Sequence, residues 1–286
     1  MKHEAYAFRM KRIRSKDNQT YKEALRLLRK KYRDQTRLFL LEGPRPVMDA
    51  LKSGAGLETV FIRESAARET AGTDAEELAA LCSSAEGGPQ CVLLADELFD
   101  KLSDTEHSQG VLAAARKPSG GAPGNRHAAK VLILDRLQDP GNIGTIIRTA
   151  EAAGFGTLIA IKGTGDIYAP KTVRAAAGSL LRVDVFEGYE TEEAVSLCRR
   201  MGLRIIAGDL EGAADYTQAD LTGGVAFAIG NEGRGVSDEL KAAADLKVRI
   251  PMEGDIESLN AAVAAGILMY EAYRQERAAQ TAGKVL

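Results

Sequence analysis

Residues 139–150 read Asp-Pro-Gly-Asn-Ile-Gly-Thr-Ile-Ile-Arg-Thr-Ala and follow a short apolar run, Val131–Leu134. The run predicts a buried strand, and Pro140 ends that strand in a turn. From Asn142 onward the residues suit a helix, with Asn142 itself as a good N-cap. A polar loop is therefore predicted between the carboxyl end of a strand and the amino end of a helix, where open α/β sheets place their ligands. Arg148 lies less than two turns into this helix, within reach of the loop.

The alternation of apolar runs and helical stretches continues to the end of the chain and predicts a doubly wound, mostly parallel α/β sheet. Strands are expected over residues 131–134, 158–161, 181–185, 205–207, 225–229 and 246–250. Helices are expected over residues 142–153, 191–201, 236–243 and 258–277. The last helix is apolar on more than one side, which indicates that one side packs on the sheet and another meets a second subunit.

Two further polar loops follow predicted strands. One spans Gly230–Gly235, and its three glycines permit close approach to a ligand and positive φ angles. It matches neither the Gly-x-Gly-x-x-Gly fingerprint nor the Walker A loop. The other runs from Ile250-Pro251-Met252 to Ser258-Leu259-Asn260, with Ser258 as a plausible N-cap. Three loops at the ends of three strands are expected to converge on one edge of the sheet.

Residues 1–117 predict a smaller α/β domain. After an irregular stretch over residues 1–19, strands are expected over 38–41, 60–62, 91–94 and 110–115, and helices over 20–34, 44–51, 74–82 and 95–102. Gly, Pro and Ser dominate residues 118–128, which is typical of a linker. The predicted domains are therefore 1–117 and 129–286, joined by 118–128.

The net charge of −2 conceals an asymmetry, because residues 1–45 are rich in Lys and Arg whereas the remainder is acidic. A basic end on an acidic body indicates an anionic partner that binds mainly there. The helix predicted over 20–34 has a basic face, and we expect four of its side chains to contact this partner: Arg26, Arg29, Lys30 and Arg33. The alternative is a basic face that is merely solvated.

Cysteine and apolar patterns exclude other classes of protein. The three cysteines form no Cys-x-x-Cys pair and have no histidine at zinc spacing, which argues against disulfides and a structural metal and favours a reducing compartment. No apolar run approaches the roughly 18 residues that span a bilayer. We therefore expect a soluble, cytoplasmic protein without a metal.

Taken together, the three loops resemble the three motifs of the SpoU (TrmH) RNA ribose 2′-O-methyltransferases, which belong to the SPOUT superfamily. The motifs occur in the family's order and approximate spacing over about residues 130–277. More loosely, the amino-terminal part resembles the family's ribosomal-protein-like substrate-binding domain. The resemblance implies a deep trefoil knot at the carboxyl end, and a homodimer built on the knotted domain.

The resemblance also implies that S-adenosylmethionine is held by main-chain contacts near four residues: Gly230, Ile250, Met252 and Leu259. In the family, the arginine at the position of Arg148 is assigned to the hydroxyl and phosphate of the substrate. Arginine is almost always protonated, so we expect Arg148 to orient the phosphate or ribose and not to act as a base.

Four further residues have expected roles in this site. Asn142 would hold Arg148 by a hydrogen bond, and Glu232 would pair with Arg148 or a neighbouring arginine. Ser258 and Asn260 would position the third loop and the ribose. A 2′-hydroxyl target makes RNA the substrate. The two-domain layout resembles the ribosomal branch of the family, which implies large-subunit ribosomal RNA as the target.

Three alternatives stay open from the sequence. The substrate of the same enzyme class could be transfer RNA, or the protein could bind RNA with the same fold and no catalysis. A nucleotide-dependent oxidoreductase is the third, suggested by the doubly wound pattern and weakened by the missing Gly-x-Gly-x-x-Gly.

Overall fold

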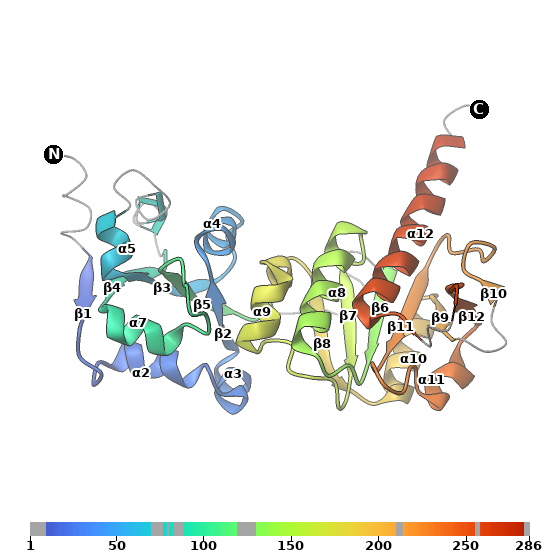
Figure 1. Cartoon of the computed structure of the whole chain (residues 1–286), viewed down its shortest axis with the longest axis horizontal. Helices are drawn as coiled ribbons and strands as arrows, with labels where there is room; N and C mark the ends of the chain where they lie inside the picture. Colours follow the sequence, from blue (N-terminus) through green and yellow to red (C-terminus); the bar gives the residue numbers. More distant parts are fainter. Residues whose placement is uncertain are drawn as a thin grey trace. The chain divides into compact units, whose positions relative to one another are not determined.

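The computed structural model describes residues 10–69, 77–78, 80–82, 88–118, 130–209, 214–254 and 258–282. Its contacts divide the chain into two units, of which the first comprises residues 1–117 and 166–181, and the second comprises residues 118–165 and 182–286 (Figure 1). Most of the predicted linker 118–128 lies outside the described residues, as does part of the helix expected over 74–82, whose described residues are helical.

The first unit contains a mixed five-stranded sheet in the order β1-β4-β3-β5-β2. β1, β4 and β3 are parallel, whereas β5 runs antiparallel to both β3 and β2. The strands are β1 (Lys11–Ile13), β2 (Leu38–Glu42), β3 (Leu57–Arg63), β4 (Gln90–Leu94) and β5 (Val111–Arg116). The helices are α2 (Gln19–Arg26), α3 (Lys30–Thr36), α4 (Pro44–Lys52), α5 (Glu64–Glu69), α7 (Asp96–Leu102) and α9 (Pro170–Ala176), with a 3₁₀ turn η1 at Ser179–Leu181. The predicted α/β domain is confirmed, although β1 occupies part of the stretch expected to be irregular.

The single basic helix expected over residues 20–34 is wrong, because the chain forms two helices there. α2 ends at Arg26 and α3 begins at Lys30, with Arg29 in extended conformation between them. The break turns the side chain of Arg33 inward, where only 3% of it is exposed, while Arg26, Arg29 and Lys30 stay exposed. The four basic side chains therefore do not form one face.

Segment 166–181 groups with the first unit although it follows β7 of the other sheet in the chain. Arg33 forms an ion pair with Asp166, and Phe39 packs against Tyr168 with ring centroids 5.1 Å apart. The ammonium group of Lys117 lies 4.4 Å from the centroid of the same tyrosine ring. Because of these contacts, segment 166–181 belongs to the first unit, and the chain does not divide into its two units at the predicted linker alone.

The second unit is built on a seven-stranded sheet in the order β10-β12-β9-β11-β6-β7-β8, and every pairing in it is parallel. Its strands are β6 (Lys130–Asp135), β7 (Thr157–Ile161), β8 (Asp184–Tyr189), β9 (Arg204–Gly208), β10 (Ala214–Asp215), β11 (Val225–Gly230) and β12 (Leu246–Arg249). Its helices are α8 (Pro140–Ala152), α10 (Thr191–Arg200), α11 (Asp238–Ala243) and α12 (Ala261–Ala282). The predicted doubly wound parallel sheet is confirmed, and the deep knot stays a prediction.

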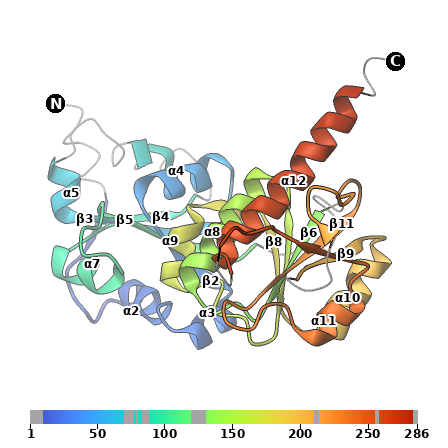
Figure 2. The same ribbon diagram turned by 45° about the vertical axis from the view of Figure 1, so that its right-hand side comes forward.

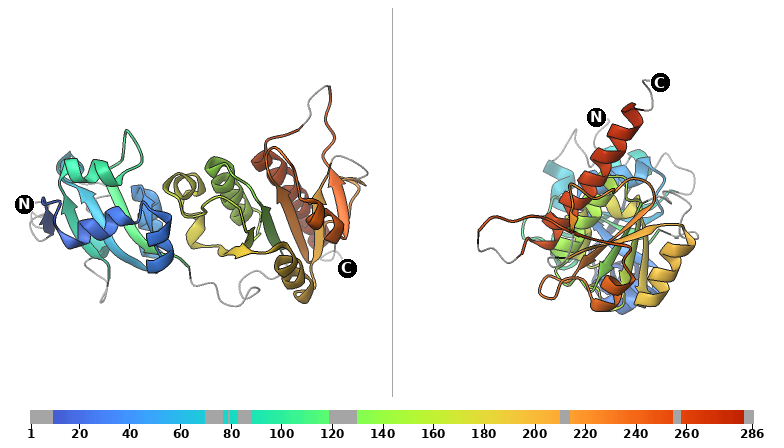
Figure 3. Two further views of the ribbon diagram at one scale, coloured as in Figure 1. Left: turned by 90° about the horizontal axis from the view of Figure 1, so that it is seen from below. Right: turned by 90° about the vertical axis from the view of Figure 1, so that its right-hand side faces the viewer.

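Helices cover both faces of this sheet, because alternate strand residues point to opposite sides. Residues such as Ile133, Ile159 and Ala228 pack with α10 and α11 in one core cluster. α8 and α12 pack against each other on the other face (Figure 2, Figure 3). The predicted strand at 181–185 begins only at Asp184, because the 3₁₀ turn η1 occupies the residues before it. No helix of the described residues is long and apolar enough to cross a membrane.

Candidate functional site

The three polar loops leave the sheet at one edge. β6 and β11 are neighbouring parallel strands, and Asp135 at the end of β6 is paired with Gly230 at the end of β11. β12 is parallel to β9, which is itself the parallel neighbour of β11. The carboxyl ends of these strands therefore meet at the same edge, as the sequence predicts, and this is where doubly wound sheets place their ligands.

α8 begins one residue after Asp139, so the expected N-cap at Asn142 is wrong. The carboxylate of Asp139 accepts a hydrogen bond of 2.8 Å from the backbone N–H of Asn142, and Pro140 occupies the first turn. An aspartate at the N-cap satisfies a backbone donor that the helix cannot. This arrangement leaves the side-chain amide of Asn142 available for contacts with other loops.

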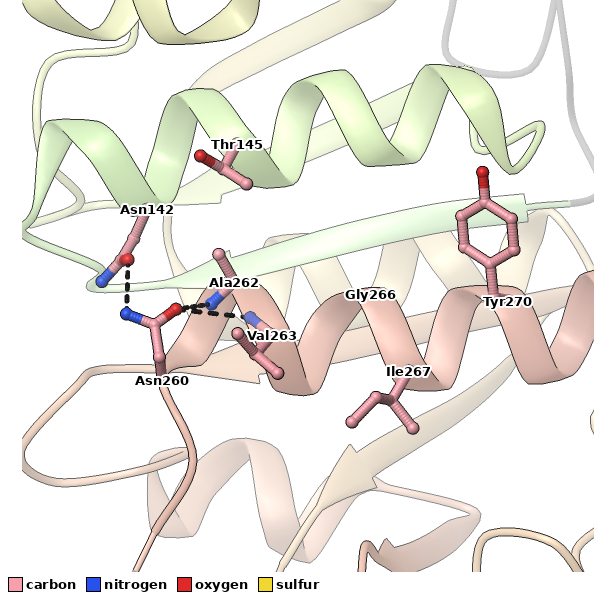
Figure 4. A pocket seen from close by; sticks show the side chains of 8 residues that line it. All are labelled: Asn142, Thr145, Asn260, Ala262, Val263, Gly266, Ile267 and Tyr270. Atoms are coloured by element: carbon pink, nitrogen blue, oxygen red, sulfur yellow. Dashed lines mark hydrogen bonds between the residues drawn. The ribbon is translucent and has the colours of Figure 1, made fainter.

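Asn142 connects all three loops through its side chain. Its Nδ2 donates a hydrogen bond of 3.1 Å to Oε1 of Glu232 in the second loop. Its Oδ1 accepts a hydrogen bond of 2.9 Å from Nδ2 of Asn260 in the third loop (Figure 4). Both ends of one amide are thus engaged, which fixes the orientation of the side chain.

Glu232 binds the first loop at three points. Besides Asn142, it accepts hydrogen bonds from the backbone N–H groups of Asp139 at 3.1 Å and Gln138 at 3.2 Å. Partial burial acts to raise the pKa of Glu232, but the hydrogen bonds that its carboxylate accepts outweigh this effect and lower the pKa. Glu232 is therefore an ionised acceptor that holds the loop. The expected pairing of Glu232 with Arg148 or a neighbouring arginine is not present among the described residues, where its carboxylate accepts hydrogen bonds from this loop instead.

Asn260, and not Ser258, caps the long helix α12. The Oδ1 of Asn260 accepts hydrogen bonds from the backbone N–H of Ala262 at 2.9 Å and of Val263 at 3.3 Å. α12 begins at Ala261, so the predicted start at Ser258 is wrong, and Ser258 is exposed in the loop before it. One residue thus fixes both the start of α12 and the position of Asn142.

The second loop is a tight turn that only glycine permits at its start. A Cβ at Gly230 would overlap the backbone of Gly235 and Val236. Asn231 closes the turn, because its Oδ1 accepts from the backbone N–H of Gly233 at 3.0 Å and its Nδ2 donates to the carbonyl of Arg136 at 2.8 Å. Sequence reasoning did not select Asn231, although an asparagine between nearby glycines, here Gly230 and Gly233, is a typical turn signal.

Four residues are predicted to hold the cofactor, and the structure places all of them in the second and third loops. Ile250 and Met252 follow β12, and Leu259 precedes α12; all three are half-buried or exposed at the surface of the loop. Partly exposed apolar side chains in a loop at the carboxyl edge of a parallel sheet are compatible with a site for an organic cofactor. Among the described residues, no group of three His, Cys, Asp or Glu residues is arranged to hold a metal ion.

Arg148 stands apart from this network. Its side chain is exposed, and it forms no hydrogen bond or ion pair with the described residues. The expected hydrogen bond from Asn142 is wrong, because six residues of helix rotate Arg148 by about 240° from Asn142. Arg148 is therefore an exposed charge on α8 with no partner among the described residues.

A groove of about 540 Å³ lies beside the network, between α8 and α12 (Figure 4). Asn142 and Asn260 line one end, and Tyr270 lines the other. Two further apolar side chains of α12, Val263 and Tyr273, are 51% and 37% exposed. The opposite side of α12 is buried, with Ala265 and Met269 fully covered, so the prediction that α12 is apolar on two sides is confirmed.

Comparison with known proteins places this arrangement in a family. The family model described as the SpoU rRNA Methylase family matches residues 129–270, and that of the MRM3-like substrate binding domain matches residues 18–113. The 23S rRNA (guanosine(2553)-2′-O)-methyltransferase RlmP of Bacillus subtilis is 35% identical over 261 residues, which cover 91% of this chain and 98% of that protein.

Solved structures agree with the sequence matches. The AdoMet-bound rRNA methyltransferase from Sinorhizobium meliloti has a TM-score of 0.81 at 31% identity and covers 93% of this chain and 98% of that one. The SpoU methyltransferase AviRb from Streptomyces viridochromogenes, solved in complex with AdoMet, has a TM-score of 0.78 at 29% identity and covers 91% and 100%. AdoMet is S-adenosylmethionine.

The fold and the three joined loops thus define this protein as an RNA methyltransferase of the SPOUT type. The chain belongs to the SpoU rRNA methylase family, so the resemblance drawn from its three loops is confirmed. At the level of the family, ribose 2′-O-methylation of RNA with S-adenosylmethionine is confirmed too.

Proposed function

We propose that this protein transfers the methyl group of S-adenosylmethionine to a ribose 2′-hydroxyl of large-subunit ribosomal RNA. The observation that supports this best is the hydrogen-bonded chain Glu232–Asn142–Asn260, which joins the three family loops. The choice of substrate is supported by RlmP, which is named for 23S rRNA and is matched over 98% of its length.

The second and third loops suit the cofactor. Gly230 allows the backbone to close tightly, and Ile250, Met252 and Leu259 offer half-buried apolar surface. We assign these four residues to its binding. The bound cofactor supplies an electrophilic methyl group on a sulfonium, so the transfer needs alignment with the attacking oxygen and an exit for its proton.

The protein's own residues would serve this alignment in distinct ways. Arg148 offers an exposed, permanently charged guanidinium whose planar fork suits a phosphate or ribose oxygen. Asn142 and Asn260 fix the loops around the reacting ribose, with Ser258 on the same loop. Glu232 has a lowered pKa, which makes it a poor proton acceptor, so we assign it to positioning and let the proton leave through phosphate or water.

The amino-terminal domain would select the RNA. Its match to a substrate-binding domain covers residues 18–113, and its exposed Arg26, Arg29 and Lys30 suit contacts with the phosphate backbone. Arg33 is excluded from this role because it is buried. We propose domains 1–117 and 129–286 joined in the chain by 118–128, although the contacts of segment 166–181 group it with the first unit.

We further propose a homodimer in which α12 lies at the interface, a deep knot in the second unit, and a cytoplasmic location with ribosomal RNA. Val263, Tyr270 and Tyr273 motivate the dimer, because exposed large apolar side chains on one helix face mark an interaction surface. Light scattering of the full chain at micromolar concentration should give twice the monomer mass. A monomer throughout that range would contradict the dimer.

The function is tested with purified protein, labelled S-adenosylmethionine and three RNA samples: unmodified 23S rRNA, 16S rRNA and bulk tRNA. We expect transfer to 23S rRNA alone, at a nucleotide whose 3′ linkage becomes resistant to alkali. Transfer only to tRNA would identify the alternative substrate. Binding of 23S rRNA without any transfer would support a catalytically silent RNA-binding protein.

A further inference from the structure

The loop that follows β7 is hydrogen-bonded to the loop that precedes α8. The hydroxyl of Thr164 donates to the carbonyl of Leu134 at 2.9 Å and accepts from the backbone N–H of Arg136 at 3.1 Å. The backbone N–H of Gly165 donates to the carbonyl of Leu137 at 2.8 Å. Within the second unit, hydrogen bonds therefore join residues 164–165 directly to residues 134–137.

One side chain strengthens this connection close to the site. The Nε2 of Gln138 donates to the carbonyl of Gly163 at 2.7 Å, while the backbone N–H of the same residue is bound by Glu232. A Cβ at Gly165 would lie 3.1 Å from the carbonyl oxygen of Gln138, so the two chains are in close contact there. A displacement of Gly165 would therefore reach Glu232 through a single residue.

The next residue in the chain, Asp166, belongs to the first unit and is held firmly in it. Its carboxylate pairs with Arg33, and the two side chains are 18% and 3% exposed. Arg33 also donates to the carbonyl of Leu27 at 2.6 Å. The carboxylate of Asp166 accepts in addition from the backbone N–H of Tyr168 at 3.1 Å, and its carbonyl accepts from the hydroxyl of Thr172 at 3.0 Å.

A buried ion pair adds little net stability, because the cost of removing both charges from water offsets their attraction. Its geometric effect is stronger, because two charged groups with several hydrogen bonds each tolerate few arrangements. The Arg33–Asp166 pair is therefore better suited to fixing the position of the backbone at residue 166 than to stabilising the fold.

We propose that Asp166, held by Arg33, is a positioning residue for methyl transfer: it fixes the chain at the point where the substrate-binding unit is covalently continuous with the loop that supports Glu232 and Asn142. This inference rests on the proposed function. The linkage runs from Arg33 through Asp166 to Gly165, and from there to residues 137–138. Through it, the unit that binds RNA sets the geometry of the loop that aligns the ribose.

The test separates positioning from stability with a set of three variants. Arg33→Met and Asp166→Asn each leave one buried charge unpaired, and each should lower Tm by about 5 °C or more. The double variant Arg33→Met with Asp166→Asn removes both charges and should recover most of that Tm. We expect its kcat for 23S rRNA to stay about 10-fold or more below wild type, with Kd for RNA and for S-adenosylhomocysteine within about 2-fold. A kcat that recovers together with Tm would show that the pair is only structural and would overturn the proposal.

Asp166→Glu provides a second test that does not depend on the double variant folding well. It keeps the ion pair but inserts one carbon–carbon bond of about 1.5 Å. A positioning role predicts a normal Tm with reduced kcat, whereas wild-type kcat contradicts it. The matched control is the buried pair Lys130–Glu276, whose side chains are 7% and 27% exposed and which lies outside the linkage; Lys130→Met with Glu276→Gln should leave kcat unchanged.

Amide hydrogen exchange keeps the inference distinct from the proposed function. If wild type methylates no RNA, the proposed function fails, and exchange at Gly165 and residues 137–139 still reports the linkage. We expect at least about 10-fold faster exchange there in the double variant than in wild type or in the Lys130–Glu276 control. Equal exchange in all three proteins would overturn the linkage.

Discussion

The three-loop edge of the second unit and the basic segment 26–33 of the first are both marked as functional by sequence patterns, yet the structure treats them differently. At the loop edge, Asn142, Glu232 and Asn260 come together although they are separated by up to 118 positions in the chain. In the basic segment, four neighbours in the chain are separated, since Arg33 is buried while the other three stay exposed.

This difference between the loop edge and the basic segment shows what each sequence pattern can predict. The loops are brought together by parallel strand order, which backbone hydrogen bonding fixes. The direction of an arginine depends on where a helix breaks and on whether a carboxylate is available to pair with it, as Asp166 is for Arg33. Charge counts therefore predict a basic region but not which of its side chains faces a partner.

The largest expected effect tests how strictly the loop edge is specified. Gly230→Ala places a Cβ against the backbone of Gly235 and Val236, so the turn cannot form. We expect a loss of about 3 kcal/mol or more in the free energy of unfolding and no detectable binding of S-adenosylhomocysteine by calorimetry. Gly233→Ala is the matched control, because its nearest contact would be an ordinary 3.7 Å. If Gly230→Ala and Gly233→Ala have the same free energy of unfolding and the same affinity for S-adenosylhomocysteine, the close backbone contact at Gly230 does not constrain the loop edge.

The second prediction concerns the one motif residue that stands outside the network. Arg148→Ala should lower the rate of methyl transfer by roughly 10²-fold, the scale seen when a positioned catalytic group is removed. Because Arg148 is exposed, Tm and cofactor affinity should stay at wild-type values. Arg148→Lys keeps the charge without the planar fork and should restore little, and exposed Arg200→Ala on α10 is the control. Normal turnover in Arg148→Ala would show that this arginine is only a solvated surface charge with no role in methyl transfer.

Much of the fold could be predicted because its signals are local and periodic. Apolar runs of three to five residues mark most strands of the parallel sheet within one or two residues. β10 is missed because a strand of two residues, Ala214–Asp215, has no apolar pattern. The caps are misplaced because Asp139 and Asn142, or Ser258 and Asn260, are equally good caps in sequence, and only the backbone conformation chooses between them.

Residue roles in the site were less predictable than its location. The motifs place Asn142, Arg148 and Glu232 at one edge, but the hydrogen bonds connect Asn142 with Glu232 and Asn260, and not with Arg148. A spacing of six residues on a helix points two side chains in different directions. The separation of Arg148 from Asn142 could therefore have been predicted from the sequence. The ion pair between Arg33 and Asp166 spans 133 positions, and no local pattern predicts such a contact.

The third prediction uses the pH dependence of the loop network. The pKa of Glu232 is lowered in the folded protein, so its contribution to stability is present above its unfolded pKa of about 4.3 and is lost as pH falls through the folded value. Glu232→Gln should reduce methyl transfer about 10-fold at pH 7 and should lower Tm at that pH. The difference in Tm between wild type and this variant should shrink below about pH 4, because the wild-type carboxylate is then protonated too. A constant difference in Tm between pH 3 and pH 8 would show that the ionised carboxylate does not hold the loop.

The smallest effect is expected in the basic segment, where the structure replaces a four-residue patch with three exposed charges. The triple variant Arg26→Ala, Arg29→Ala, Lys30→Ala should weaken RNA binding about 3- to 10-fold and leave S-adenosylhomocysteine binding intact. On single-stranded RNA, each phosphate that is no longer neutralised reduces the slope of log K against log salt by about 0.7, so filter binding over a range of salt concentrations should show a slope smaller by up to about 2. Arg26 also packs over the ring of Tyr32 at 5.0 Å, so Arg26→Lys with the other two residues intact separates this packing from the charge. Unchanged affinity and slope in the triple variant would mean that the basic segment is a solvated surface, and that the RNA is bound elsewhere on the protein.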